Sequence, residues 1–238
     1  MKTFEVNGIR YEINSDGTSV TVIKNAYSGI VIIPPQVQYL NNIYRVTSIG
    51  DWAFFGCSGI TSLTIPDSVT VIGYYAFLGC IGITSLTIPD SVTSIGDWAF
   101  ASCSDLERIT VDSHNVNYDS RGDCNAIIET ATNTLIAGCK NTTIPKSVTS
   151  IGDSSFYGCS GITSLTIPDS VTVIGNEAFE DCDALTEIKS FAIVPPTCGN
   201  RAFDNINKEE CILYVPKGQI DAYKQAEEWK DFVCIKEM

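Results

Sequence analysis

A unit of about 23 residues recurs along this chain and restricts its fold more than any other feature. Ile65–Gly73 and Ile88–Gly96 share the pattern Ile-Pro-Asp-Ser-Val-Thr-x-Ile-Gly at a shift of 23 residues, and Ile144–Thr149 and Ile167–Thr172 are related by the same shift. Self-similarity at a fixed period of this length is typical of stacked supersecondary units, none of which can bury its apolar face alone. The sequence therefore predicts a solenoid.

Five copies of the unit continue into a small residue, Phe and, three residues after the Phe, Cys. These are Ala53-Phe54 with Cys57, Ala76-Phe77 with Cys80, Ala99-Phe100 with Cys103, Ser155-Phe156 with Cys159, and Ala178-Phe179 with Cys182.

Each unit contains two short extended pieces and a turn. Ile60–Ile65 alternates apolar and hydroxyl residues over its second half, which predicts a half-buried strand that ends at Pro66, and successive copies should pair in parallel. Val69–Ile72 predicts a second short strand. From Gly73 to Cys80 the spacing of the apolar residues predicts one helical turn. Two apolar walls and one helical edge then close each coil.

The chain divides into three predicted segments. Residues 1–45 form an N-terminal β-rich cap with a first irregular coil, residues 46–190 form the repeat solenoid with an enlarged coil at 111–143, and residues 191–238 form a degenerate coil with a helical cap. Caps are needed because an open solenoid end exposes core and strand edges. The elements expected outside the repeat are strands at Phe4–Val6, Tyr11–Ile13 and Val20–Val22, a hairpin-like pair at Ala126–Ile128 and Thr134–Ile136, and an amphipathic helix from Gln219 to Lys230.

At these residues the chain resembles the BspA-like leucine-rich repeat family, whose unit is similar to Cys-x-x-Leu-x-x-Ile-x-Ile-Pro-x-x-Val-x-x-Ile-Gly-x-x-Ala-Phe-x-x-Cys. The match runs with interruptions from about Val46 to Ser190, and Tyr214–Gly218 with Trp229–Phe232 is similar to the family's terminal segment. The resemblance implies an α/β repeat: a right-handed leucine-rich-repeat solenoid of roughly 23-residue coils with parallel short strands. It also implies a cell-surface or secreted protein that binds a protein or glycan on a host or neighbouring cell, with no catalytic residues.

Charge and hydropathy exclude two classes of partner. The net charge of -13 repels phosphate backbones and anionic headgroups, so nucleic acid is not expected as a partner. No apolar stretch approaches the roughly 20 residues of a membrane helix, so membrane insertion is not expected. Met1–Val6 lacks the apolar core of a signal peptide, which leaves a cytosolic protein and a trimmed signal both open. At 44% hydrophobic residues the chain needs no partner to fold, and we expect a monomer.

The cysteines of the repeat column are expected to be free thiols, because parallel side chains at equivalent positions of adjacent coils disfavour disulfide geometry. A pair among the remaining cysteines could be oxidised; these are Cys124, Cys139, Cys198, Cys211 and Cys234.

The sequence offers no constellation for metal or nucleophilic chemistry. It has no Cys-x-x-Cys and a single histidine, His114, so we predict no metal, no cofactor and no catalytic residues. A glycan-acting hydrolase that uses two of the 28 acidic residues remains a remote alternative. Asp67, Asp90 and Asp169 recur after the Pro, and we expect them to be solvated rather than to bind calcium.

Two surfaces could bind a partner. The outward positions of the main strands form hydroxyl-rich columns that include Arg108, and these either support β-pairing or face a ligand. The helical edge places an apolar strip on the first three coils that becomes polar toward the C-terminus, which the fold does not require. The alternative is that this strip is covered, or packs only against itself. The candidate partner-binding residues are Trp52, Phe55, Tyr75, Leu78, Trp98 and Arg108.

The enlarged coil contains Arg121-Gly122-Asp123, the tripeptide that integrins recognise, although it is equally compatible with an ordinary turn. Together these features predict a non-enzymatic binding or adhesion module that recognises a protein or glycan through its repeat surface. The nearest alternative is a structural spacer domain within a larger surface protein.

Overall fold

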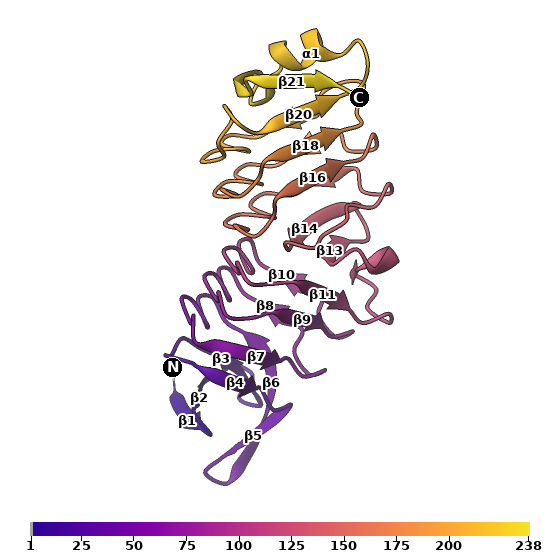
Figure 1. Ribbon diagram of the computed structural model, residues 1–238. Coiled ribbons are helices and arrows are strands. Elements are labelled where there is room, and N and C mark those ends of the chain that lie inside the picture. Colours follow the sequence, from indigo (N-terminus) through magenta and orange to yellow (C-terminus); the bar gives the residue numbers. More distant parts are fainter. Residues whose placement is uncertain (1) are drawn as a thin grey trace. The chain divides into compact units, whose positions relative to one another are not determined.

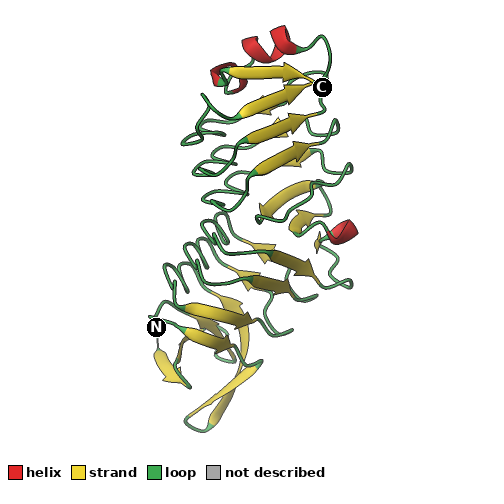
Figure 2. Ribbon diagram, in the orientation of Figure 1, coloured by secondary structure: helices red, strands yellow, loops and turns green. Residues whose placement is uncertain are grey.

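A computed structural model describes residues 2–238 and divides the chain into two compact units, Met1–Asp119 and Ser120–Met238. Within each unit, short parallel strands of successive coils lie side by side, and turns and loops connect them (Figures 1 and 2). The boundary between the units falls inside the predicted enlarged coil. The three segments predicted from the sequence remain a prediction.

In the unit Met1–Asp119, each coil contributes one strand to a back sheet and one to a front row of strands. The back sheet has the order β1-β2-β3-β6-β8-β10, with β5 paired to β6, and in the front row β4 pairs with β7 and β9 with β11. The strands are β1 (Thr3–Val6), β2 (Ile9–Ile13), β3 (Ser19–Val22), β4 (Gly29–Ile32), β5 (Gln36–Tyr39), β6 (Asn42–Ile49), β7 (Ile60–Thr64), β8 (Val71–Ile72), β9 (Ser85–Ile88), β10 (Ser94–Ile95), β11 (Arg108–Val111) and β12 (Tyr118–Asp119).

The three strands expected near the N-terminus are present as β1, β2 and β3. Strands β1, β2 and β3 form antiparallel pairs that continue the back sheet beyond β6. Asn7 and Gly8 both have positive φ, 50° and 76°, as expected for a two-residue hairpin turn. Tyr11 and Val22 are buried and close the core at this end.

In the unit Ser120–Met238, the hairpin of β13 (Ala126–Glu129) and β14 (Thr134–Gly138) begins the back sheet, as the sequence predicts, and β14, β15, β17 and β19 continue it in parallel. The front sheet has the order β16-β18-β20-β21, also parallel. The remaining elements are η1 (Arg121–Asp123), β15 (Ser150–Ile151), β16 (Ser164–Ile167), β17 (Val173–Ile174), β18 (Glu187–Ser190), β19 (Thr197–Cys198), β20 (Ile212–Val215), α1 (Ile220–Gln225), η2 (Trp229–Asp231) and β21 (Cys234–Glu237).

The predicted helical edge is wrong. The segment that follows each back strand is a series of reverse turns, so the repeat is a β-solenoid and not an α/β repeat. We call these segments the turn edges. Their backbone N–H groups donate to carbonyls of the next coil, as Phe54 N does to Ala76 O at 2.7 Å and Phe77 N to Ala99 O at 2.8 Å. A helix would satisfy its N–H groups internally, whereas these turns satisfy theirs between coils.

Ser and Thr hydroxyls of the repeat also bond to the preceding coil. The Ser of the Ile-Pro-Asp-Ser segment donates to a backbone carbonyl one coil earlier, as Ser68 Oγ does to Val46 O at 2.6 Å and Ser91 Oγ to Val69 O at 2.6 Å. Gly73 has no room for a side chain, because an added Cβ would lie 2.6 Å from the backbone N of Asp51. The regular positions of the repeat are therefore explained by contacts between neighbouring coils.

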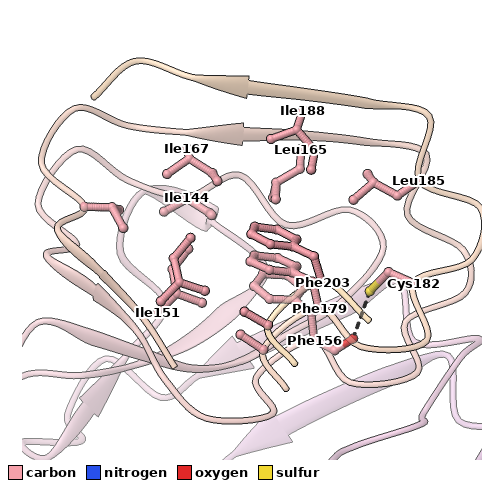
Figure 3. Packing of buried hydrophobic residues seen from close by; sticks show 14 of the residues in the cluster. Ile144, Ile151, Phe156, Leu165, Ile167, Phe179, Cys182, Leu185, Ile188 and Phe203 are labelled. Atoms are coloured by element: carbon pink, nitrogen blue, oxygen red, sulfur yellow. Dashed lines mark hydrogen bonds between the residues drawn. The ribbon is translucent and has the colours of Figure 1, made fainter. Parts of the chain in front are cut away.

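Phenylalanines of the turn edges form the centre of each core. In Ser120–Met238 the rings of Phe156, Phe179 and Phe203 stack with centroids 5.0 and 5.4 Å apart, and all three are buried (Figure 3). In Met1–Asp119, Phe54 and Phe77 stack in the same way at 5.0 Å. Each ring buries its faces against the rings of the adjacent coils, so loss of one ring leaves a cavity in two interfaces.

All ten cysteines are free thiols. Three of the column, Cys80, Cys103 and Cys182, donate to the carbonyl of the Phe one coil earlier. Cys182 Sγ lies 3.2 Å from Phe156 O (Figure 3), and Cys80 Sγ lies 3.1 Å from Phe54 O. Burial raises the pKa of Cys159 to about 12 and that of Cys211 to about 11. The expectation that the column forms no disulfide is confirmed, and no disulfide joins the other cysteines either.

The C-terminal cap contains less helix than the sequence predicts. Helix α1 has six residues, Ala226 is extended with ψ 135°, and Glu228 has φ 68° before η2 begins. This backbone carries the Glu228 carboxylate to the end of the turn-edge ladder, where it accepts N–H bonds from Arg201 at 3.0 Å and Phe203 at 3.4 Å. In the preceding coils the equivalent N–H groups donate to carbonyls of the next coil. The Glu228 carboxylate therefore supplies the acceptors that the carbonyls of a further coil would supply.

Among residues 2–238, no helix combines the length and the apolar character that crossing a bilayer requires.

We expect Phe77→Ala to lower the free energy of unfolding by about 3–5 kcal/mol, because a fully buried ring is lost from the stack. Phe55→Ala is the control, because the Phe55 side chain is 39% exposed, and this change should lower the free energy of unfolding by about 1 kcal/mol or less. Urea unfolding followed by circular dichroism measures both variants. Equal losses would mean that the assignment of inside and outside is wrong.

The Glu228 cap predicts a difference between two adjacent glutamates. Glu228→Ala removes two charge-assisted hydrogen bonds and should cost about 1.5–3 kcal/mol of stability. Glu227→Ala is the matched control, since Glu227 is 80% exposed and contacts only Lys230 among the ion pairs described for residues 2–238, so its cost should stay below about 1 kcal/mol. Thermal unfolding of both variants measures the difference, and equal melting temperatures would contradict the capping role.

The raised thiol pKa values predict a loss of stability at alkaline pH. A thiol whose pKa rises from 9.0 to about 12 on folding, such as Cys159, stabilises the fold fully below pH 9 and progressively less as the pH rises toward 12. The melting temperature should therefore fall between pH 9 and 11. Cys159→Ser replaces the thiol by a hydroxyl of similar shape that does not titrate in this range, so the melting temperature of this variant should fall less steeply than that of the wild type. An identical slope for both proteins would contradict this origin.

Candidate functional site

Five of the six predicted partner-binding residues lie together on the turn edges of Met1–Asp119. They form what we call the aromatic strip: Trp52, Phe55, Tyr75, Leu78 and Trp98. The sixth, Arg108, lies on a different element, the front strand β11, where it is exposed and in register with Ser85. The structure thus brings five of the predicted residues together and separates one.

The rings of the strip stack along the coils. Trp52 and Tyr75 have centroids 4.1 Å apart at 13°, and Tyr75 and Trp98 follow at 5.8 Å and 28°. Phe55 meets Trp52 edge-on at 5.1 Å. Trp52 remains 40% exposed and Phe55 39%. The strip therefore packs partly against itself, and it also offers apolar surface to solvent.

The backbone of the strip has an unusual conformation. Trp52, Tyr75 and Trp98 have φ values of 60°, 57° and 62°, in the left-handed region that bulky residues rarely adopt. Ser154 and Glu177, at the equivalent positions of Ser120–Met238, have φ values of 53° and 55°. The turn therefore imposes the left-handed backbone in every coil, whatever the side chain. The fold explains the conformation of the strip but not its aromatic residues.

In Ser120–Met238 the positions equivalent to Trp52, Tyr75 and Trp98 carry Ser154, Glu177 and Arg201, and Tyr157 keeps a ring at the position equivalent to Phe55. Arg201 contacts Glu177 at 3.4 Å and Asp204 at 3.2 Å, and it also pairs with Glu180. Burial raises the pKa of Glu180, although the Arg201 guanidinium opposes that shift. The hydrogen bond to Asp204 is the main cause that raises the pKa of Arg201. The column thus changes from apolar to ionic between the two units.

Sequence reasoning missed the burial of Glu180. Its side chain is only 3% exposed, and its second oxygen, Oε2, has no hydrogen-bond partner; Ser154 Oγ and Ser155 Oγ are likewise buried and unpaired among residues 2–238. The only sign of this burial in the sequence is that Ser155 and Glu180 stand at positions where most other copies of the repeat have apolar residues.

One cavity adjoins the N-terminal end of the strip. It has a volume of about 470 Å³ and is lined by Lys24–Tyr27 and Phe55–Gly59. Lys24 Nζ lies 4.9 Å from the centre of the Phe55 ring. A cation and an aromatic ring therefore lie side by side at this end.

The hydroxyl columns of the front strands bond to each other. Thr87 Oγ1 and Thr110 Oγ1 are 3.0 Å apart across β9 and β11. This contact is the one expected if threonine supports pairing between coils.

The Arg121-Gly122-Asp123 tripeptide forms the short 3₁₀ turn η1. Gly122 and Asp123 both have positive φ, 65° and 53°, and Arg121 donates to Asn133 Oδ1 at 2.8 Å. The arginine therefore contacts its own unit, and the tripeptide is a tight turn rather than an extended loop.

The described residues contain no cluster that resembles a metal site or a nucleophilic triad. No group of three or more His, Cys, Asp or Glu side chains within residues 2–238 has metal-binding geometry. His114 is 83% exposed on its side chain and contacts Asp112 at 3.0 Å. Asp67, Asp90 and Asp169 are all exposed.

Comparison with solved structures finds a similar fold in a bacterial cell surface protein. A leucine-rich cell surface protein from Faecalibacterium prausnitzii is 21% identical, with 91% of this chain and 89% of that chain covered and a TM-score of 0.50. A leucine-rich repeat protein from T. pallidum is 20% identical over 96% of this chain and 93% of that chain, with a TM-score of 0.47. No curated protein matches the chain.

The sequence model described as "BspA type Leucine rich repeat region" matches six copies of the repeat, over residues 36–133 and 133–222. These matches cover most of the chain. Proteins built from this repeat are generally surface or interaction proteins without catalytic activity. The chain belongs to the BspA-type leucine-rich repeat family.

Proposed function

We propose that this protein is a non-enzymatic binding module of the cell surface or the secreted fraction, and that its aromatic strip contacts a protein partner. The observation that carries the proposal is the difference between equivalent turn edges. One backbone conformation holds Trp52, Tyr75 and Trp98 in the first unit but Ser154 and Glu177 in the second. Since the same turn accepts polar residues, folding does not require three large aromatic residues in succession, and an exposed apolar surface of this kind is typical of a binding site.

The stacking geometry favours a protein over a glycan. Sugars pack their C–H groups onto exposed aromatic faces, but the faces of Tyr75 are covered by Trp52 on one side and Trp98 on the other. Ring edges, which carry partial positive charge, are what such a stack can present outward. Apolar side chains and carbonyl oxygens of a protein surface complement an edge of this kind, and aromatic residues are typical of the energetic centres of protein interfaces.

The family supports the location and the type of function. The Faecalibacterium prausnitzii protein with the same fold is named a cell surface protein. We extend that location to this chain as part of the proposal, with host proteins or proteins of neighbouring cells as the partner class and with adhesion as the biological role. Arg108, on the front strand, is a separate candidate contact.

A test is binding of the purified protein to arrays of host matrix proteins and of glycans. We expect binding to a protein ligand, and we expect the double variant Trp52→Ala/Trp98→Ala to bind that ligand at least about tenfold more weakly, as loss of an interface centre does. Phe191→Ala is the matched control, because Phe191 is 46% exposed but lies outside the strip, and its affinity should equal that of the wild type.

Two results would contradict the proposal. Unchanged affinity of the double variant for its ligand would make the strip structural. No binding on either array would favour a spacer domain that holds other domains apart, which is the alternative that a regular solenoid also fits.

A further inference from the structure

The caps close the core at each end, but neither cap adds a strand to the front strands. In Met1–Asp119 the cap strands β1–β3 extend only the back sheet, and β4 pairs with β7 alone. In Ser120–Met238, α1 and η2 replace a back strand, and β21 pairs with β20 alone. The first front strand of Met1–Asp119, β4, and the last front strand of Ser120–Met238, β21, therefore each lack a strand partner on their other side within residues 2–238.

The hydrogen-bond register identifies the unpaired backbone groups. Gly29 N and Ile33 N donate toward the β7 side, to Gly59 O at 2.7 Å and Thr64 O at 3.1 Å. Because the N–H groups of successive residues point to opposite edges of a strand, those of Ile30 and Ile32 point away from β7, to the open side of β4. In β21, Met238 N donates to Val215 O of β20 at 2.9 Å. The N–H of the preceding residue, Glu237, therefore points to the open side of β21.

Strand β4 also differs from the other front strands in its side chains. Ile30 and Ile32 are 72% and 63% exposed and are in register with Ser62 and Thr64 of β7. A cavity of about 280 Å³ lies beside β4, lined by Asn7–Ile9, Ala26–Ser28 and Ile30–Ile32. No residue of β7 lines it, so it lies on the open side of the strand. An uncovered edge with apolar residues is a template for another strand.

Charge restricts what can approach this edge. The chain has 15 basic and 28 acidic residues, of which residues 1–45 contain four basic and three acidic. Those 45 residues thus have a net charge of +1, whereas the remaining residues, with 11 basic and 25 acidic, have -14. An acidic partner, including a second copy of this chain, is repelled everywhere except at the N-terminal end.

We propose that two copies of this protein associate end to end, with β21 of one copy pairing in parallel with β4 of the next. Front strands within each copy already pair in parallel, as β4 does with β7 and β21 with β20, so the new pair repeats an arrangement that the fold uses throughout. Outward residues of β21, such as Lys236, would then lie beside Ile30 and Ile32, where the aliphatic stem of the lysine covers apolar surface.

The second copy fits the edge better than a foreign peptide does. Strand β21 is already extended and fixed on β20, so pairing needs no ordering of a flexible segment. The contact joins two different surfaces and therefore leaves one open edge of each kind at the ends of every assembly, which allows longer chains of copies. This proposal replaces the monomer that composition alone suggests, and it does not depend on the proposed partner of the aromatic strip.

Sedimentation of the 238-residue protein over a range of concentrations tests the proposal. We expect the mean mass of the wild type to rise with concentration. Ile32→Pro removes the N–H on the open side of β4 while the bonds to β7 remain, and Glu237→Pro does the same at β21, so each variant alone should be a monomer. An equimolar mixture should form a 1:1 dimer and nothing larger, because one open β21 meets one open β4.

The controls separate strand pairing from other causes. Ile32→Thr and Glu237→Gln keep the N–H groups and should still associate, and circular dichroism melting confirms that both proline variants are folded. A wild type that stays monomeric at its highest soluble concentration would overturn the proposal. So would dimerisation of Glu237→Pro alone, because that result would mean that β4 pairs with β4.

Discussion

The rest of this structure depends on hydrogen bonds between successive coils. A coil of about 23 residues contains two strands of a few residues and a series of turns, and none of these can satisfy its backbone groups internally. The front strands, the back strands and the turn edges each donate to the coil beside them. Ser68, Cys80 and their equivalents add side-chain bonds in the same direction. Stability is therefore a sum over neighbouring coils, and each end of the array needs a substitute for the absent neighbour.

The two ends solve that problem in different ways. At the N-terminal end, β1–β3 continue one sheet and bury Tyr11. At the C-terminal end, the Glu228 carboxylate takes the place of two backbone carbonyls, and Trp229 and Phe232 cover the last Phe of the stack. Neither cap adds a strand to the front strands. The same constraint that demands caps thus leaves two complementary edges, and it frees the outward side chains of the turn edges to vary from rings to ions without loss of the fold.

The sequence is sufficient to predict the features that repeat. The period, the strands, the Phe core and the thiol column follow from it because each is set by contacts within and between identical units. The turn edges are mispredicted because Ala76, Phe77 and Cys80 have a spacing that consecutive reverse turns and a helix share, and the left-handed residues are Trp52 and Tyr75 rather than glycine. The C-terminal helix is overestimated because Glu228 leaves the helical path to bind Arg201 and Phe203, a contact between distant residues. The strip is predictable as a set of residues, but its ring stacking is not.

The central claim is that the turn edges are hydrogen-bonded between coils as fully as the strands are. Amide hydrogen exchange of the native protein tests it most directly. We expect the N–H groups of Phe54, Phe77, Phe156 and Phe179, which donate to the next coil at 2.7–2.8 Å, to exchange as slowly as those of the front strands. Exchange of these four amides at the rate of exposed loop amides would contradict it, because the turn edges would then be connectors and not part of the structure that holds the coils together.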